Sequence, residues 1–215
     1  SDNGSVGILW AVGQNGTILK NVIYSNVLAG DYYIPQGDHE QGFATLGAAV
    51  TALNTYGAIA PVTFYIDADL IEPGSELIID REDLTAETAL TIKPASGKTP
   101  SITINDFPTT GNYSGQGFTI ENTAYVTIDG SNTSGGTSRD LTIIGNDTDG
   151  KCVIGVIDNS DFITVKNVNI TFENLLASGS ILGVDGYTGV PNSLLIKNCQ
   201  IGSHRLCALP GTWRR

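Results

Sequence analysis

The chain has 215 residues, of which 40% are hydrophobic and only 15% are charged. This balance excludes a disordered chain, which is poor in apolar residues, and a coiled coil, which is rich in charged ones. The net charge is −11 and no apolar run reaches the length of a membrane span, so we expect no nucleic acid and no membrane as partners, because phosphate groups would be repelled.

Residues 1–30 contain two short apolar runs on either side of Asn15-Gly16. Asn-Gly favours the tight turn of a β-hairpin. The sequence therefore predicts an N-terminal extension or hairpin over residues 1–30, with the edge of a neighbouring domain as the alternative.

Residues 31–61 precede the first strand-like segment and contain one predicted helix over Gly42–Tyr56. Its apolar residues recur at steps of three and four: Phe43, Leu46, Val50 and Leu53. This spacing is typical of an amphipathic helix, and Gly57 can end it. A helix directly before the first strand predicts an N-terminal cap, which would cover the open end of a stack of strands.

Residues 62–203 repeat a five-residue word in which apolar, Thr, apolar and polar residues are followed by a turn residue. The word begins at Leu90, Ile102, Phe118, Val126, Ile163 and Ile170, with near-matches at Val62, Leu141 and Leu194. Each word predicts a short strand with one apolar face. A sandwich, a barrel or a β-solenoid would fit, and the solenoid is favoured because Val126, Ile163 and Leu194 recur at intervals of roughly 30 to 40 residues.

A stack of such repeats would place equivalent residues above one another. Asn167 and Asn198 would occupy equivalent turns, where their amides can hydrogen-bond along the stack. Asp129, Lys166 and Lys197 would share one outward position on adjacent coils, about 5 Å apart. Outward groups in such a row form a linear track, which suits a polymer chain.

The segment Asp31–Asp67, with Pro61–Phe64 as its strand after the helix, resembles the start of secreted right-handed parallel β-helix proteins of the pectin-lyase-like, Bacteroidetes type. Ile163–Asn167 and Leu195–Cys199 resemble their coil repeats. The resemblance covers about residues 31–202. It implies an all-β fold, a right-handed parallel β-helix over 62–203 with an N-terminal capping helix, in a secreted or cell-surface protein. Residues 204–215 form a tail without this pattern.

The proteins that the chain resembles include polysaccharide lyases, glycoside hydrolases and adhesins, and a fold alone does not fix a function. The signatures of the familiar polygalacturonases are missing from the sequence. The resemblance still implies a polysaccharide as the partner. If the protein is an enzyme, we expect a glycoside hydrolase first and a lyase second.

The candidate catalytic residues are Asp129 with Glu121 or Asp158. Two carboxylates about 5–9 Å apart can act on a glycosidic bond, one as acid and the other as base or nucleophile. Ordinary solvated charges are the alternative for all three. Lys166 could act as a base, or it could form a surface ion pair with Asp129.

The candidate substrate-binding residues are two cations of the track and two aromatic residues. Lys166 and Lys197 would line the polymer, and Tyr113 and Tyr187 would stack on sugar rings. Packing inside the protein is the alternative for each tyrosine.

We assign no metal-ligating residues and expect no cofactor, although Ca²⁺ binding stays open as an alternative. Acidic residues gather between Asp67 and Glu87, and Asn146–Gly150 resembles part of a calcium loop. Gly145 stands where that loop would need its first ligand. Solvated turn acids are the alternative.

The leading hypothesis is a secreted carbohydrate-active protein that binds, and could hydrolyse, a polysaccharide along the flank of the β-helix. The alternative is a non-catalytic structural or adhesin module of a larger secreted protein. The module is favoured by the absence of Met from a chain that begins at Ser1. The exposed flanks and ends of a β-solenoid could contact another copy, so a homo-oligomer stays open as an expectation.

Overall fold

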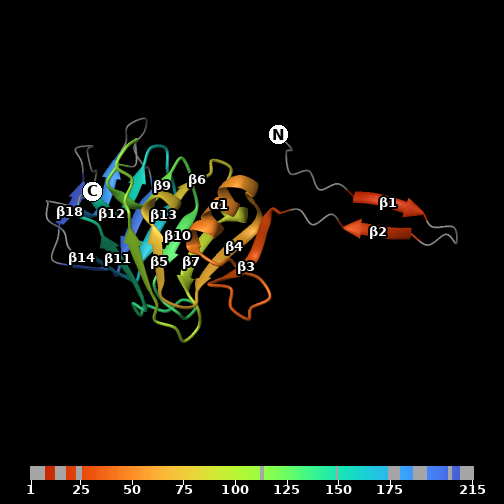
Figure 1. Cartoon of the computed structure of the whole chain (residues 1–215), viewed down its shortest axis with the longest axis horizontal. Coiled ribbons are helices and arrows are strands. Elements are labelled where there is room, and N and C mark those ends of the chain that lie inside the picture. The colour runs from red at the N-terminus through yellow and green to blue at the C-terminus, as the bar shows by residue number, and fades with distance from the viewer. Residues whose placement is uncertain are drawn as a thin grey trace.

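The chain is predominantly β, and most of its strands lie in parallel sheets (Figure 1). In this computed structural model, residues 26–111, 114–148, 150–173 and 193–202 are described, together with the backbone of strands at 8–12, 18–22, 180–185 and 205–208. β1 (Ile8–Val12) and β2 (Ile18–Val22) pair antiparallel, as the strands of a hairpin do.

The other strands belong to three sheets, which we name B, C and D. Sheet B contains β3 (Leu28–Ile34), β4 (Ala58–Ile66), β7 (Leu90–Pro94), β10 (Val126–Asp129), β13 (Ile163–Lys166) and β16 (Leu194–Lys197). Sheet C contains β5 (Leu70–Pro73), β8 (Ser101–Asn105), β11 (Leu141–Asn146), β14 (Val168–Glu173) and β17 (Gln200–Ile201). Sheet D contains β6 (Ile78–Asp80), β9 (Gln116–Glu121), β12 (Cys152–Ile157), β15 (Ser180–Asp185) and β18 (Arg205–Ala208).

From β4 onward the chain enters sheets B, C and D in turn and then returns to sheet B. We call one such pass a circuit. Neighbouring strands within each sheet run parallel, so each circuit lies against the one before it. Two short 3-10 turns, Gly74–Glu76 and Ala86–Thr88, flank β6.

One cluster of buried apolar side chains takes members from all three sheets. Strands β7, β8, β11 and β13 alternate buried and partly exposed residues, because successive side chains of a strand point to opposite faces. β9 and β12 differ, since every residue in them is buried.

The predicted words all correspond to strands, and those at Val126, Ile163 and Leu194 lie in the same sheet, as expected. The words did not reveal β5, β6 and β12, which contain no Thr. Sheet B also begins before the first predicted strand. Its β3 escapes the pattern because Gly30 has a φ of 84° and the register shifts between Leu28 and Gly30.

The predicted helix is present as α1 (Leu46–Tyr56), but it begins at Leu46 rather than Gly42, because the Thr45 side chain caps it by accepting the N–H of Ala48. It ends at Gly57, whose φ is 71°. The carboxylate of Glu72 in β5, which is 1% exposed, accepts hydrogen bonds from the backbone N–H groups of Leu46 (2.7 Å) and Gly47 (3.1 Å). The first turn of α1 contains no acidic residue of its own. Glu72 therefore supplies the negative charge and the acceptors that a helix N-terminus needs.

The other end of α1 is tied to sheet D. The amide of Asn54 donates to the carbonyl of Ile78 at 2.7 Å and accepts from the N–H of Asp80 at 3.2 Å. Arg81 Nη1 donates to the carbonyl of Asn54 at 2.9 Å. The helix is thus fixed across β5 and β6, the first strands of sheets C and D.

Candidate functional site

Sheet B has an outward face on which side chains of successive circuits lie in rows. One row consists of four threonines in register: Thr63, Thr91, Thr127 and Thr164. Two residues further along the strands, Asp129 pairs with Lys166 and Lys166 pairs with Lys197. The three charged residues are in register as expected, but Asp129 is buried rather than open to a ligand.

At the carboxyl end of β10, both oxygens of the buried Asp129 carboxylate have partners. Lys166 Nζ lies 3.1 Å from Oδ2. Asn167 Nδ2 and the backbone N–H of Ser131 donate to Oδ1, at 2.7 Å and 3.1 Å. The carboxylate therefore joins two neighbouring circuits as an internal acceptor, and the expected ion pair with Lys166 is present.

The next circuit extends these contacts. Asn198 Nδ2 donates to Asn167 Oδ1 at 2.8 Å, which confirms the predicted stacking of the two amides. Arg139 Nη1 donates to Asn198 Oδ1 at 2.9 Å. Both Asn residues have positive φ, 58° and 52°, a conformation that Asn tolerates better than most residues. We call Asp129, Lys166, Asn167 and Asn198 the polar ladder.

Glu121 and Asp158 lie on another sheet. Glu121 ends β9 and Asp158 follows β12, and both residues are buried. Glu121 pairs with Ile157, so the two acids lie on neighbouring strands of sheet D. Asp129 stands at the far end of β10 from this corner, and β10 alone spans about 10 Å at ~3.3 Å per residue. The structure brings Glu121 and Asp158 to one corner but does not bring Asp129 to them.

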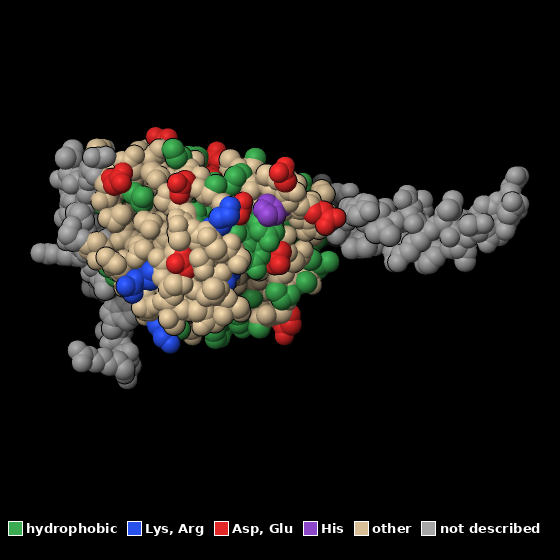
Figure 2. Space-filling model, turned by 90° about the horizontal axis from the view of Figure 1, so that it is seen from below, with side chains coloured by type: hydrophobic (Ala, Val, Ile, Leu, Met, Phe, Trp, Pro, Cys, Tyr) green, Lys and Arg blue, Asp and Glu red, His purple; other side chains and the backbone are tan. Residues whose placement is uncertain are grey.

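The other predicted binding residues divide into two groups. Lys197 is exposed at the end of β16, next to Lys166 in the register. Tyr113 and Tyr187 lie outside the described residues. On the face seen in Figure 2, acidic side chains stand apart from one another over the surface.

The opposite end of the same strands carries two aromatic rings. Tyr125 directly precedes β10 and Phe162 directly precedes β13, and their rings stack with centroids 4.7 Å apart at an interplanar angle of 14°. Both residues have positive φ, 57° and 51°. Bulky residues rarely adopt this conformation, and such strain is concentrated at functional sites. We call Tyr125 and Phe162 the aromatic stack.

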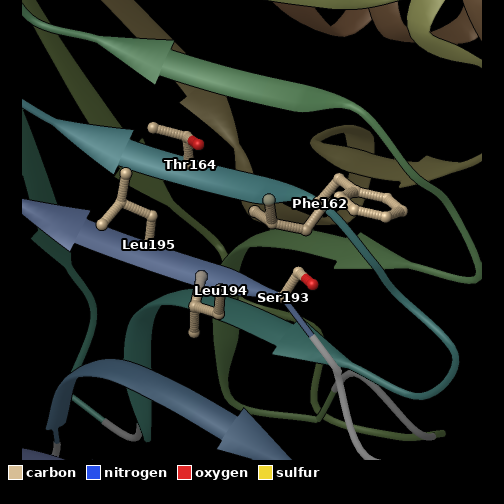
Figure 3. A pocket seen from close by; sticks show the side chains of 6 residues that line it. Phe162, Thr164, Ser193, Leu194 and Leu195 are labelled. Atoms are coloured by element: carbon tan, nitrogen blue, oxygen red, sulfur yellow. The ribbon is translucent and has the colours of Figure 1, made fainter.

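An open hollow of about 360 Å³ lies beside the aromatic stack, over the starts of β13 and β16 (Figure 3). Its lining consists of Phe162, Ile163, Thr164, Ser193, Leu194 and Leu195. Ile163 pairs with Leu194. Ser193, the residue before Leu194, is therefore equivalent in position to Phe162, the residue before Ile163 in the preceding circuit. Phe162 is 50% exposed, and the small side chain of Ser193 leaves it open at the hollow.

The sequence interpretation selected Tyr113 and Tyr187 and missed Tyr125 and Phe162. A signal for the missed pair was present, because each of these residues stands immediately before a five-residue word. Two aromatic residues at the same place in two repeats predict neighbouring rings once the repeats are stacked.

A second aromatic cluster lies at the N-terminal end of sheet B. Tyr33 stacks between His39, with ring centroids 3.6 Å apart, and Tyr65, with centroids 5.2 Å apart. Asp67 lies 3.6 Å from His39 Nε2 and 3.3 Å from Lys98 Nζ. Burial, followed by the nearby Asp31 carboxylate, raises the pKa of the Tyr65 phenol. Two protein rings stack on Tyr33, whereas one ring, that of Tyr125, stacks on Phe162.

Several acids that the sequence suggested for Ca²⁺ accept hydrogen bonds from the protein. Asp69 accepts from the N–H and the hydroxyl of Ser101, which lowers the pKa of its carboxyl. Asp147 accepts a hydrogen bond from the N–H of Phe107 at 3.0 Å, and Glu72 accepts one from the N–H of Leu46 at the start of α1. Within the described ranges, no three His, Cys, Asp or Glu side chains gather as a metal site requires.

Comparison of the chain with protein-family models, with curated proteins and with solved structures gives no match. The resemblance to pectin-lyase-like proteins therefore stays an expectation from the sequence. In the part of the chain that the structure describes, no helix has the length and apolar character that crossing a bilayer requires.

Proposed function

We propose that this chain is a non-catalytic module of a secreted or cell-surface protein that binds a polysaccharide on the outward face of sheet B. The observation that carries the proposal is the Phe162 ring, which is 50% exposed and held at positive φ beside an open hollow. The apolar C–H face of a sugar ring gains free energy by covering an aromatic ring. The hydroxyls of Thr164 and Ser193 add hydrogen-bonding groups in the same hollow.

The proposal includes the finer description of the fold as a right-handed parallel β-helix with α1 as its cap. The regular order of sheets B, C and D and the parallel pairing support the β-helix. Connections between parallel strands of one sheet are almost always right-handed, which supports the hand. The ties from α1 to β5 and β6 support the role of the helix as a cap.

Binding without hydrolysis is proposed because of where the three candidate acids lie. Asp129 is buried in the polar ladder, and Glu121 and Asp158 are buried at a corner of another sheet. Most glycoside hydrolases use two carboxyl groups that both reach the glycosidic bond. The placement of Asp129 in a different sheet from the other two favours a structural role for it.

The proposal is tested by affinity electrophoresis in gels that contain single plant or microbial polysaccharides. We expect at least one polysaccharide to retard the native chain and to retard Phe162→Ala less. The same mixtures are assayed for new reducing ends and for the ultraviolet absorbance of unsaturated sugars. Product formation by either assay would show catalysis and overturn the non-catalytic part, and migration unaffected by every polysaccharide would overturn the binding part.

A second candidate function is a rigid structural or adhesin module. The polar ladder favours it, because hydrogen bonds between successive circuits hold the stack in one register. Migration that no polysaccharide changes, together with a single cooperative unfolding transition, would favour this second function.

A further inference from the structure

We infer that the hollow beside Phe162 binds one neutral pyranose ring, which stacks on Phe162 as a third ring of the aromatic stack. The inference rests on the proposed function and names the class of polysaccharide, a neutral one, that the outward face of sheet B would take.

The spacing of the aromatic stack indicates where a sugar ring would lie as the third ring. Tyr125 and Phe162 stand at the same position of neighbouring circuits, and their 4.7 Å separation matches the ~4.8 Å spacing of adjacent strands. One strand further, the same position belongs to Ser193, whose side chain contains no ring. A ring that continued the stack at this spacing would lie in the hollow that Phe162 and Ser193 line.

The lining of the hollow selects a neutral sugar. None of its six residues carries a charge. Lys166 lies four residues after Phe162, about 13 Å along the backbone at ~3.3 Å per residue, and its ammonium is engaged by Asp129. The nearest acid in sequence, Asp161, accepts the N–H of Phe162 at 2.9 Å. A uronic acid carboxylate in the hollow would therefore lose hydration without gaining a cation.

The hydroxyl groups of the hollow fit the polar edge of such a ring. The hydroxyls of Thr164 and Ser193 can each donate and accept a hydrogen bond, so each can pair with a sugar hydroxyl that acts as acceptor or as donor. Leu195, which is 51% exposed, adds apolar surface from the neighbouring strand. Together with Phe162 this gives an apolar face with polar groups beside it, the composition typical of small-molecule sites.

Three variants test the inference. Phe162→Ala removes the ring on which the sugar would stack. Ser193→Phe places a ring of the protein at the third position while Phe162 stays in place. Ile71→Ala is the matched control, because Ile71 is also a large exposed apolar residue, 74% exposed, but lies on sheet C.

The measurement is affinity electrophoresis in parallel gels that contain a neutral polysaccharide, either a β-glucan or a xylan, or polygalacturonate as the acidic comparison. We expect a neutral polysaccharide to retard the native chain and Ile71→Ala equally. Phe162→Ala and Ser193→Phe should bind it about tenfold more weakly, the loss expected from about 1.4 kcal/mol of stacking. Circular dichroism of each variant checks its fold, and Phe162→Ala decides the result if Ser193→Phe does not fold.

Retardation by polygalacturonate alone would overturn the inference and leave the proposed function standing. Retardation by a neutral polysaccharide that folded Phe162→Ala retains in full would overturn the inference and the role of Phe162 in the proposed function, while polysaccharide binding as such would stand. Absence of retardation in every gel would overturn the inference and the proposed function together.

Discussion

The two ends of strands β10 and β13 use their side chains in different ways. At the carboxyl ends, the polar ladder joins successive circuits through hydrogen bonds that run from the buried Asp129 and Asn167 to the exposed Asn198. At the amino ends, Phe162 stacks on Tyr125 but keeps half of its surface exposed. The hydrogen bonds at the carboxyl ends stabilise the register of the circuits, whereas the exposed apolar surface at the amino ends is available to a ligand. Substitutions at the two ends should therefore differ sharply in their effect on stability.

The largest effect is expected at Gly130, directly after Asp129. A Cβ at this position would overlap the backbone carbonyl of Asn167, which belongs to the next circuit and cannot move alone. We expect Gly130→Ala to lower the free energy of unfolding by about 3 kcal/mol. Urea denaturation measures this loss of free energy of unfolding, with Ser134→Ala in the adjacent exposed loop as the control. A loss as small as that of the control would show that the circuits at this end are not closely packed.

The next largest effect is expected when the central acceptor of the polar ladder is removed. Asp129→Ala leaves the Asn167 amide, the Ser131 N–H and the Lys166 ammonium without this acceptor, at a cost of about 2 kcal/mol. Lys166→Ala should cost less than about 1 kcal/mol, because that side chain is 34% exposed and its charge is screened by water. Thermal unfolding of the two variants measures the difference. Equal losses would mean that the ion pair alone accounts for the role of Asp129.

A smaller effect is expected from the amides. Gly tolerates the positive φ of both Asn positions, so Asn→Gly removes the amide without adding backbone strain. We expect Asn167→Gly to cost about 1 kcal/mol, because Asn167 is buried and bonds to Asp129 and Asn198. Asn198→Gly, at an exposed residue, should cost about half as much. Chemical denaturation ranks the two, and the reverse order would place the stabilising part of the ladder at its exposed end.

The smallest effect is expected at the aromatic stack. Phe162→Gly loses a half-exposed ring contact but relieves a φ of 51°, so the two contributions should offset each other to within about 0.5 kcal/mol. The midpoint of urea unfolding checks this. A loss above about 2 kcal/mol would make Phe162 part of the core and remove the contrast between the two ends.

Much of the fold could be predicted from the five-residue words, because in sheet B the Thr in their second position stands outward between two buried residues. β12 could not be found in this way, since Cys-Val-Ile-Gly-Val-Ile is buried throughout and shows no alternation. β3 was missed because a positive φ at Gly30 interrupts it. The words thus predict strands that contain the repeated Thr, including the fully buried β9, and they miss strands without it, such as β5 and β12.

The candidate site was harder to predict because its partners are distant in the sequence. Asp129 was expected to face a substrate, yet its partner Asn167 stands 38 residues later, and only the stacking of circuits brings the two together. Phe162 was overlooked because its exposure depends on Ser193 in the following circuit. A larger residue at that position would turn the same phenylalanine into an interior ring.

Glu72 makes the helix near the start of the chain depend on a strand that is synthesised after it. This carboxylate reaches back 26 residues to hold the first N–H of α1, and the 11-residue helix is shorter than the ~12–15 residues that an isolated helix needs to persist in water. A peptide of the helix alone should therefore be unfolded. The helix can become stable only after β5 has been synthesised and has docked. Its amide protons should then exchange with solvent together with those of β5, as one cooperative unit.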